Sequence, residues 1–355
     1  MTSKRPRVLL SYFFGPRAIP LGWSCARALE ALGCEVDRFD SGVESPVDRW
    51  VFRPVNKLAW NLGLRSLDVS TDSPWNNQNY RQARLAEAVE RFRPELLLVI
   101  RGHGFGAPFL RGLKTQYGVG KTIGWWVRGP EWFDMMRDEA RAYDHYFCIH
   151  KEGYGETDPI IPFPALAVDD VLYRKLDLGG GRGVGPEVVF VGGWTPQRQQ
   201  ILERLLDFPL TIYGQRWRKH NVVKPRLLAR IRGSGIWGEA LIRLYSAAKI
   251  VLNITRWDAS QHSGLNLRVF DVPACGAFFL TDYSEQLAEY FRLGIDIETF
   301  KDLPELQDKL RFYLAHDEAR ERIARSGHEK VQSFGTYRDK MRAMLDMVAT
   351  AGERS

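Results

Sequence analysis

Short apolar runs alternate with helical patterns along most of the chain, and this alternation restricts the fold more than any other feature. The clearest example is a helical pattern over residues 80–92, which Pro94 ends before the apolar run Leu96–Ile100. Such a run is typical of a strand buried on both faces of a parallel sheet. Further strands are expected at 7–10, 35–39, 122–127, 146–149, 188–191, 210–213, 250–254 and 277–281. The chain is therefore predicted to be an α/β protein with doubly wound, Rossmann-like sheets.

The length and the placement of proline and glycine indicate two domains. The chain has 355 residues, more than the roughly 100 to 200 residues of a usual single domain. Prolines and a glycine run between residues 159 and 186 are typical of a connector. We predict an N-terminal domain at 1–178, a linker at 179–187 and a C-terminal domain at 188–335. A C-terminal helix and tail at 336–355 are expected to pack back on the first domain.

The cysteines and the hydropathy indicate a cytoplasmic protein. Cys25, Cys34, Cys148 and Cys275 are widely spaced and lie in apolar surroundings, so buried, reduced thiols are expected. No segment approaches the roughly 18 uninterrupted apolar residues of a membrane span.

Positive charge is concentrated in one segment of the second half. The net charge is +7, and residues 208–238 contain no Asp or Glu. The same stretch holds seven basic residues: Arg216, Arg218, Lys219, Lys224, Arg226, Arg230 and Arg232. A run of this kind binds phosphates, nucleic acid or an anionic membrane surface, and a solvated basic face is the alternative. A peripheral contact at the inner membrane face is one expectation.

Several familiar motifs are absent or incomplete. Residues 118–122 resemble the end of a phosphate-binding P-loop, but Thr115 stands where the first glycine belongs. Residues 102–107 fit Gly-x-Gly-x-x-Ala after a strand, without the acidic ribose-binding residue expected about 20 positions later. No metal-ligand spacing and no Gly-x-Ser-x-Gly elbow occurs, so neither a metal site nor a hydrolase nucleophile is predicted.

Loops that follow successive strands of the second half carry glycines, aromatic side chains and a cation. These residues are Gly192, Gly193, Trp194, Arg198, Tyr213, Gly214, Trp237 and Asn253. Glycine lets the backbone approach a ligand, a cation balances phosphate charge, and an aromatic face stacks on a flat base. Core packing is the alternative for Tyr213 and Trp237. The pattern favours binding of a nucleotide.

A polar loop and the helix after it extend this pattern. The candidate residues are His262, Ser263, Gly264, Asn266, Arg268 and Asp271. Free backbone amides at a helix start around residues 264–267 would bind a diphosphate, and Arg268 adds a charge-assisted hydrogen bond. Asp271 is suited to accept hydrogen bonds from ribose hydroxyls. Taken alone, Asp271 would more often be a solvated helix carboxylate, but the order of elements around it favours the ribose contact.

From about residue 187 to 337 the sequence resembles the CgeB-like glycosyltransferase family of GT-B fold. The resemblance rests on residues 190–198, 212–214, 244–253 and, most strongly, 264–277. It implies two Rossmann-like domains that face each other across a cleft. The second domain would bind a nucleoside diphosphate sugar as substrate, without a cofactor, and the first would hold the acceptor.

The resemblance also implies a retaining, metal-independent transfer. In related enzymes two glutamates with seven residues between them act on the sugar and the ribose, and their positions here are Ser263 and Asp271. His103 is the candidate base or orienting group, and Glu131 is a second candidate. The acceptor is a small molecule, a glycan or a lipid-linked molecule; nucleic acid is not expected as a partner.

Two other functions remain open at this point. Ser263 is consistent with a binding protein that has lost transfer activity. The basic residues of 215–232 are consistent with a protein that binds anionic surfaces.

Overall fold

The computed structural model describes residues 6–15, 19–101, 105–169, 171–179, 185–219 and 223–351. The chain forms two compact units. The first comprises Met1–Cys148, Tyr154–Pro162 and Met344–Ser355, and the second comprises Ile149–Gly153 and Phe163–Ala343.

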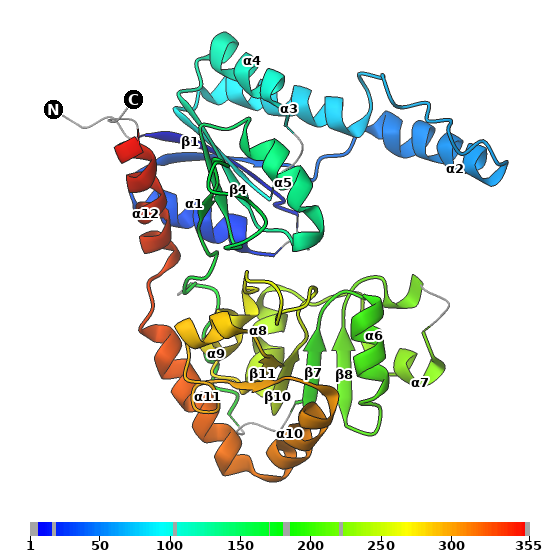
Figure 1. The fold of residues 1–355 in the computed structure, drawn as a ribbon, viewed down its shortest axis with the longest axis vertical. Helices are drawn as coiled ribbons and strands as arrows, with labels where there is room; N and C mark the ends of the chain where they lie inside the picture. Colours follow the sequence, from blue (N-terminus) through cyan, green and yellow to red (C-terminus); the bar gives the residue numbers. More distant parts are fainter. Residues whose placement is uncertain are drawn as a thin grey trace. The chain divides into compact units, whose positions relative to one another are not determined.

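The first unit contains a six-stranded parallel sheet of order β2-β1-β3-β4-β5-β6 (Figure 1). Its strands are β1 (Arg7–Tyr12), β2 (Glu35–Asp40), β3 (Leu96–Ile100), β4 (Lys121–Trp126), β5 (His145–Cys148) and β6 (Ile161–Pro162). Its helical segments are α1 (Leu21–Ala31), η1 (Asp48–Phe52), α2 (Arg53–Asn61), α3 (Asn77–Phe92), α4 (Ala107–Tyr117), η2 (Pro130–Trp132) and α5 (Phe133–Ala140).

Local signals in the sequence explain where these helices begin and end. The Asn76 side chain accepts a hydrogen bond from the Asn79 amide and caps α3. Gly118 ends α4 in a left-handed conformation that suits glycine. Apolar side chains of α3, α4 and α5 pack in one core cluster with β3, so these helices cover the same face of the sheet.

The second unit contains another six-stranded parallel sheet, of order β12-β11-β10-β7-β8-β9. Its strands are β7 (Val188–Val191), β8 (Leu210–Tyr213), β9 (Ile231–Gly233), β10 (Ile250–Asn253), β11 (Phe279–Asp282) and β12 (Glu298–Phe300). Its helical segments are α6 (Pro196–Glu203), η3 (Trp217–Lys219), α7 (Pro225–Leu228), α8 (Gly238–Ala247), α9 (Arg268–Ala274), η4 (Glu285–Glu289), α10 (Leu303–Ala315) and α11 (Asp317–Gln332); α12 (Tyr337–Ala351) runs from this unit into the first.

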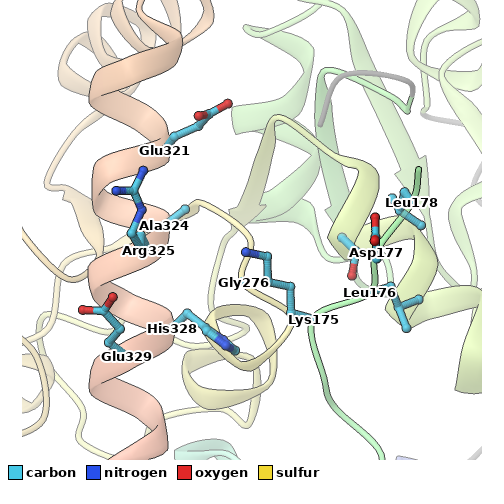
Figure 2. Close-up of a pocket in the computed structure, with 11 residues that line it drawn as sticks. Lys175, Leu176, Asp177, Leu178, Gly276, Glu321, Ala324, Arg325, His328 and Glu329 are labelled. Carbon is cyan, nitrogen blue, oxygen red and sulfur yellow. The ribbon is translucent and has the colours of Figure 1, made fainter. Parts of the chain in front are cut away.

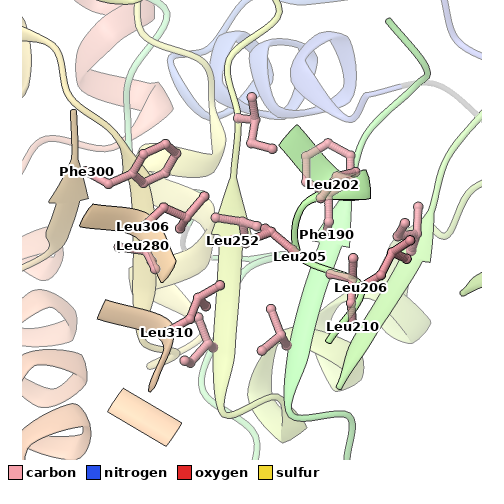
Figure 3. Packing of buried hydrophobic residues seen from close by; sticks show 14 of the residues in the cluster. Phe190, Leu202, Leu205, Leu206, Leu210, Leu252, Leu280, Phe300, Leu306 and Leu310 are labelled. Atoms are coloured by element: carbon pink, nitrogen blue, oxygen red, sulfur yellow. The ribbon is translucent and has the colours of Figure 1, made fainter. Parts of the chain in front are cut away.

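Successive residues of the strands in the second unit point to opposite faces, as strand geometry requires. Leu252 and Leu280 pack with α6 and α10, as Figure 3 shows. Val251 and Phe279, one position earlier in each strand, pack with α8 and α9 on the other face. Both faces are therefore covered by helices, which confirms the doubly wound α/β prediction.

The two units divide at positions other than the predicted boundaries. Residues 163–178, which the sequence predicts in the first domain, cluster with the second unit. The Val168 amide donates to the Gly335 carbonyl, and the Tyr337 hydroxyl donates to the Ala165 carbonyl. These long-range hydrogen bonds carry no signal in the local sequence. Residues 344–355 of the C-terminal segment belong to the first unit, where Lys121 donates to the Val348 carbonyl at 2.6 Å.

All four cysteines are buried, as predicted. In the part of the chain that the structure describes, no helix has the length and apolar character needed to cross a membrane. Within the same residues, no group of three or more His, Cys, Asp or Glu side chains is arranged to hold a metal ion.

Candidate functional site

The loop after β7 is anchored by a buried arginine. Thr195 caps α6 by accepting a hydrogen bond from the Arg198 amide, and this places Arg198 in the first turn. Its guanidinium donates to the Ile254 carbonyl at 2.8 and 3.0 Å and to the Gly193 carbonyl at 2.9 Å. Arg198 therefore links the carboxyl ends of β7 and β10.

The charge environment of Arg198 is unusual for a buried cation. Arg198 is only 7% exposed. Burial, with smaller effects from nearby Arg268 and Arg256, lowers the pKa of Arg198 to about 9, and Asp282 acts in the opposite direction. Three arginines thus share the edge of the sheet where open α/β proteins bind ligands.

Close backbone packing explains the glycines after β7 and β8. A Cβ on Gly214 would lie 1.8 Å from the Gly192 carbonyl oxygen. The same oxygen accepts a hydrogen bond from the Trp217 indole at 2.9 Å. The Gly192 amide donates to the Tyr213 carbonyl at 2.8 Å. The two loops are held together so tightly that only glycine fits at Gly214.

The aromatic candidates lie at the same edge of the sheet. The Trp194 indole donates to Gln199 at 2.7 Å, and its ring packs partly against the core. Tyr213 is half-buried and packs against the other core cluster. Trp237 is half-buried and precedes α8, with its ring against Gly235. Tyr213 thus makes core contacts, the alternative that the sequence left open.

Asn253 belongs to a buried polar network at the ends of β10 and β11. It is 1% exposed, and its amide donates to Thr281 at 2.9 Å and to Asp282 at 3.3 Å. The Thr255 amide and hydroxyl both donate to Asp282 at 2.9 Å. Burial raises the pKa of Asp282 despite these hydrogen bonds. Asn253 therefore supports the loop that contains Thr255.

Ser263 is held by a residue that the sequence did not predict. The Ser263 amide donates to Glu152 at 2.9 Å, and its hydroxyl donates to the other oxygen of the same carboxylate. The Lys151 amide donates to the Ser263 hydroxyl at 2.7 Å. Glu152 follows β5 in the sequence but clusters with the second unit. A carboxylate therefore lies directly against the side chain of Ser263.

Two imidazoles lie near the same carboxylate. His150 Nδ1 is 3.6 Å and His262 Nδ1 is 3.5 Å from Glu152 Oε1. The His150 ring is fully buried and meets Trp257 edge-on. Gly264 has a φ of +91° and lies so close that a Cβ would be 2.6 Å from the His150 ring. Only glycine suits this position.

Gln286 completes this cluster from η4. Its Oε1 accepts a hydrogen bond from the Gly264 amide at 2.8 Å. The residue is 5% exposed, and its Nε2 has no hydrogen-bond partner among the described residues. A buried donor of this kind is costly unless a ligand or water satisfies it.

The helix that carries Arg268 and Asp271 begins later than the sequence predicts. α9 starts at Arg268, has seven residues and contains Pro273. The Arg268 amide donates to the Asn266 side chain at 3.1 Å. The amides of Ser263, Gly264 and Arg268 therefore already have side-chain acceptors. The prediction of free amides around residues 264–267 is wrong for Gly264.

Asp271 is turned inward, which the sequence did not anticipate. The residue is 8% exposed and accepts a hydrogen bond from Tyr173. Burial holds the pKa of Asp271 well above its usual range, Asp169 raises it further, and Arg268 acts in the opposite direction. Half-buried Arg268 donates to the Tyr245 hydroxyl. The reading of Asp271 as a solvated helix carboxylate is therefore wrong.

Of the two catalytic candidates in the first domain, Glu131 is among the described residues. His103 lies outside the described residues. Glu131 is exposed in η2 of the first unit.

The basic segment of residues 215–232 is largely tied to its own unit. Arg218 donates to the Ile231 carbonyl, and Arg230 donates to the Leu206 carbonyl. Lys224 pairs with Glu203 at 3.1 Å. Arg226 pairs with Asp207 at 3.3 Å. Four of the seven cations thus have partners within the second unit.

Two cavities of the second unit lie near different ends of the strands. One, of about 730 Å³, lies between α11 and residues 175–178, near Gly276 before β11 (Figure 2). Ligands of open α/β sheets bind beyond the carboxyl ends of strands, and this cavity lies at the opposite end of the strands. Another, of about 320 Å³, lies at the carboxyl ends of β10, β11 and β12, lined by Ile254, Asp282 and Lys301.

The sequence matches one family model and is similar to a known spore protein. Residues 197–346 match the family model described as glycosyl transferase-like. The chain is 24% identical over 287 residues to spore protein CgeB of Bacillus subtilis (strain 168), covering 74% of this chain and 85% of that protein.

Solved structures support the fold. Sucrose-phosphate synthase from Thermosynechococcus elongatus is similar with a TM-score of 0.65 and 14% identity, covering 99% of this chain and 100% of that one. Anabaena HepE, solved with UDP and glucose, gives a TM-score of 0.60 and 10% identity, covering 98% and 100%. The chain is therefore a glycosyltransferase that is similar in sequence to CgeB, and its two parallel sheets and structural neighbours show the GT-B fold.

Proposed function

We propose that this chain transfers a sugar from a nucleoside diphosphate sugar, held by the second unit, to an acceptor held by the first. The observation that carries the proposal is the group of Arg198, Arg256 and Arg268 at the carboxyl ends of the strands. Arg268 and Arg256 each lower the pKa of Arg198, so the three side chains create a positive potential together. A diphosphate at this edge would reduce that electrostatic cost.

The nature of the ligand in related folds supports a nucleotide donor. HepE of Anabaena has been solved with UDP-glucose as well as with UDP and glucose. We extend the donor class, a nucleoside diphosphate sugar, to this chain. In this proposal the loops after β7 and β8 approach the diphosphate, and Tyr213 or Trp237 lies against the base.

The reaction breaks the bond between the anomeric carbon and the diphosphate oxygen and forms a bond to an acceptor oxygen. The leaving diphosphate gains negative charge, which Arg198 and Arg268 stabilise in a metal-independent reaction. The acceptor loses its proton to a base, for which His103 is the first candidate and Glu131 the second. The resemblance implies that the anomeric configuration is retained. Small molecules, glycans and lipid-linked molecules are the acceptor classes.

Glu152 gives the sugar side of the site a carboxylate. Related enzymes hold an acidic residue at the position of Ser263, and the Glu152 carboxylate accepts two hydrogen bonds from Ser263. We assign Glu152 to the role that Ser263 cannot fill. The Gln286 amide, buried beside Gly264, is suited to donate to a sugar hydroxyl.

A nucleotide-sugar-binding protein without transfer activity is the second candidate. The serine at position 263 favours it, and the Glu152 carboxylate beside that serine weighs against it. Binding of anionic surfaces through residues 215–232 is less favoured, because four of the seven cations are engaged within the unit.

Release of nucleoside diphosphate from nucleotide sugars tests the proposal. Purified protein is incubated with sugar conjugates of uridine, guanosine, adenosine, thymidine and cytidine diphosphates, with water as the default acceptor. We expect release from at least one donor and slower release by Arg268→Gln. Exposed Arg325, which lines the cavity at the other end of the strands, gives the control Arg325→Gln. Binding of a donor without release would instead support the inactive binding protein.

A further inference from the structure

Residues 49–67 of the first unit, called the arm below, expose more apolar surface than a folded segment ordinarily does. Trp50 is 70% exposed, Leu58 59%, Trp60 60% and Leu62 68%. Within α2 only Ala59 is buried. Contiguous exposed apolar side chains of this size mark an interaction surface.

The apolar residues of the arm form a face. Val51, Val55, Leu58 and Leu62 follow one another at intervals of four, three and four residues, which places them on one side of a helix. In a surface helix this side ordinarily packs on the core. Here all four side chains are exposed, and α2 lies beyond the end of α3, away from the sheet of its own unit (Figure 1).

The arm is folded without a partner. The Asn56 side chain donates to Asp68 at 2.7 Å and accepts from the Val69 amide at 3.0 Å, which closes the chain back on α2. At its base, Asn77 donates to Asp48 at 2.6 Å and accepts from the Ser45 amide at 2.8 Å. The apolar face is therefore held ready for contact.

The charge of the arm selects one kind of partner. Residues 49–67 contain Arg49, Arg53, Lys57 and Arg65 and no acidic residue. The Arg49 and Arg65 guanidinium groups lie over the rings of Trp50 and Trp60, at 5.0 and 5.4 Å from the ring centroids. Arg53 pairs with Asp48 and Glu44, just outside the arm. A helix with leucine and valine on one face, interleaved tryptophans and basic residues is typical of a segment that lies in the interface of an anionic bilayer.

A second copy of the chain fits the arm less well. A symmetric contact would bring two basic segments together, and like charges oppose such a contact. α2 has nine residues, whereas a membrane span needs roughly 20, so insertion parallel to the surface is the geometry available.

The basic segment of residues 215–232 lacks these properties. Its apolar side chains Val223 and Leu227 are buried in the core of the second unit. Membrane contact, which the sequence suggests for that segment, is therefore better carried by the arm.

We propose that the arm binds the surface of an anionic lipid bilayer, with its apolar face among the acyl chains and its basic residues at the phosphates. This inference goes beyond the proposed transfer reaction and does not depend on it.

Vesicle binding by the full-length chain tests the proposal. Flotation with vesicles of equimolar phosphatidylglycerol and phosphatidylcholine is compared with flotation with phosphatidylcholine alone. We expect binding to the anionic vesicles, with a blue shift of tryptophan emission, and weaker binding at raised salt. The double variant Leu58→Ser/Leu62→Ser should bind at least about tenfold more weakly.

The control is a double variant with equally exposed apolar residues in the second unit, Val171→Ser/Ile295→Ser, which are 61% and 51% exposed in the wild type. It should bind vesicles as the wild type does, and thermal unfolding verifies that both variants fold. Equal binding to both vesicle types, or unchanged binding by the Leu58/Leu62 variant, would overturn the proposal. The proposal would also be overturned if the chain does not bind vesicles and light scattering shows a dimer that only the Leu58/Leu62 variant dissociates.

Discussion

Folded proteins usually bury apolar side chains and expose charged ones. The candidate site of the second unit and the arm of the first depart from this pattern in opposite directions. The elements at the carboxyl ends of the strands bury an arginine, a glutamine amide and an aspartate, at Arg198, Gln286 and Asp271. The arm exposes tryptophan and leucine. Each departure lowers stability unless a partner compensates for it. The candidate site therefore fits a charged, polar ligand, and the arm fits an apolar surface with anionic groups.

This comparison predicts that changes in the candidate site disturb folding or chemistry, whereas changes on the arm do neither. The largest effect is expected for Gly214→Ala. The added Cβ would lie 1.8 Å from the Gly192 carbonyl oxygen, and backbone cannot yield as a flexible side chain does. We expect a loss of about 3 kcal/mol in the free energy of unfolding, measured by urea denaturation.

Gly112→Ala is the matched control, because a Cβ at Gly112 in α4 meets no atom within 4 Å. This variant should gain up to about 1 kcal/mol from helix propensity. Equal stability of the two variants would show that the loops after β7 and β8 are looser than described.

The next effect concerns the carboxylate beside Ser263. Glu152→Gln keeps the size of the side chain and removes its charge, so kcat/KM should fall by about 100-fold. Affinity for the nucleoside diphosphate alone should not change, because Glu152 is assigned to the sugar. The control is Glu289→Gln, which removes only the exposed ion pair with Lys151. A loss of nucleotide affinity equal to the loss of kcat/KM would contradict this division of roles.

The sequence predicts the sheets well and the contacts within the site less well. Apolar runs locate β7 and β10, whose carboxyl ends lead to Arg198 and include Asn253. Glu152 was missed because its contact with Ser263 spans 111 residues of sequence. The only available signal was its place just after a strand. Asp271 turns inward because Tyr173, from the connecting segment, covers α9.

The segment that contains the arm gave no prediction at all. Residues 41–79 mix polar and aromatic residues without the apolar runs that mark the strands elsewhere. Helical spacing alone does not reveal whether such a face will be buried or exposed.

Asp271 makes stability depend on pH in a predictable direction. Its pKa is raised in the folded chain, so its full contribution is present below the ordinary aspartate pKa of about 4. That contribution is lost as the pH rises through the folded-state pKa, because ionisation then opposes burial. Asp271→Asn lacks this titration and can still accept from Tyr173. It should become more stable than wild type as the pH rises from about 4 to about 8.

Thermal unfolding across this range checks the prediction. Asp308→Asn, at an exposed carboxylate paired with Arg311, serves as the control and should follow the wild type. Parallel curves for Asp271→Asn and wild type would mean that the Asp271 carboxylate is not buried.

The smallest effect is expected on the arm. Leu58→Ser should change the free energy of unfolding by less than about 0.5 kcal/mol, because the side chain is already exposed. Leu252→Ala, in the core of the second unit, should cost about 2 to 5 kcal/mol. Urea denaturation of both variants measures the difference, and a large loss for Leu58→Ser would mean that the arm packs on its own chain.

The most direct test of the central claim is a thermal-shift measurement with nucleoside diphosphates. A ligand that binds only the folded state raises the unfolding temperature. We predict that at least one of the uridine, guanosine, adenosine, thymidine or cytidine diphosphates stabilises the wild type and Arg325→Gln, and that Arg268→Gln binds it about tenfold more weakly. No shift with any of the five, or equal shifts in wild type and Arg268→Gln, would contradict a nucleotide site at these arginines.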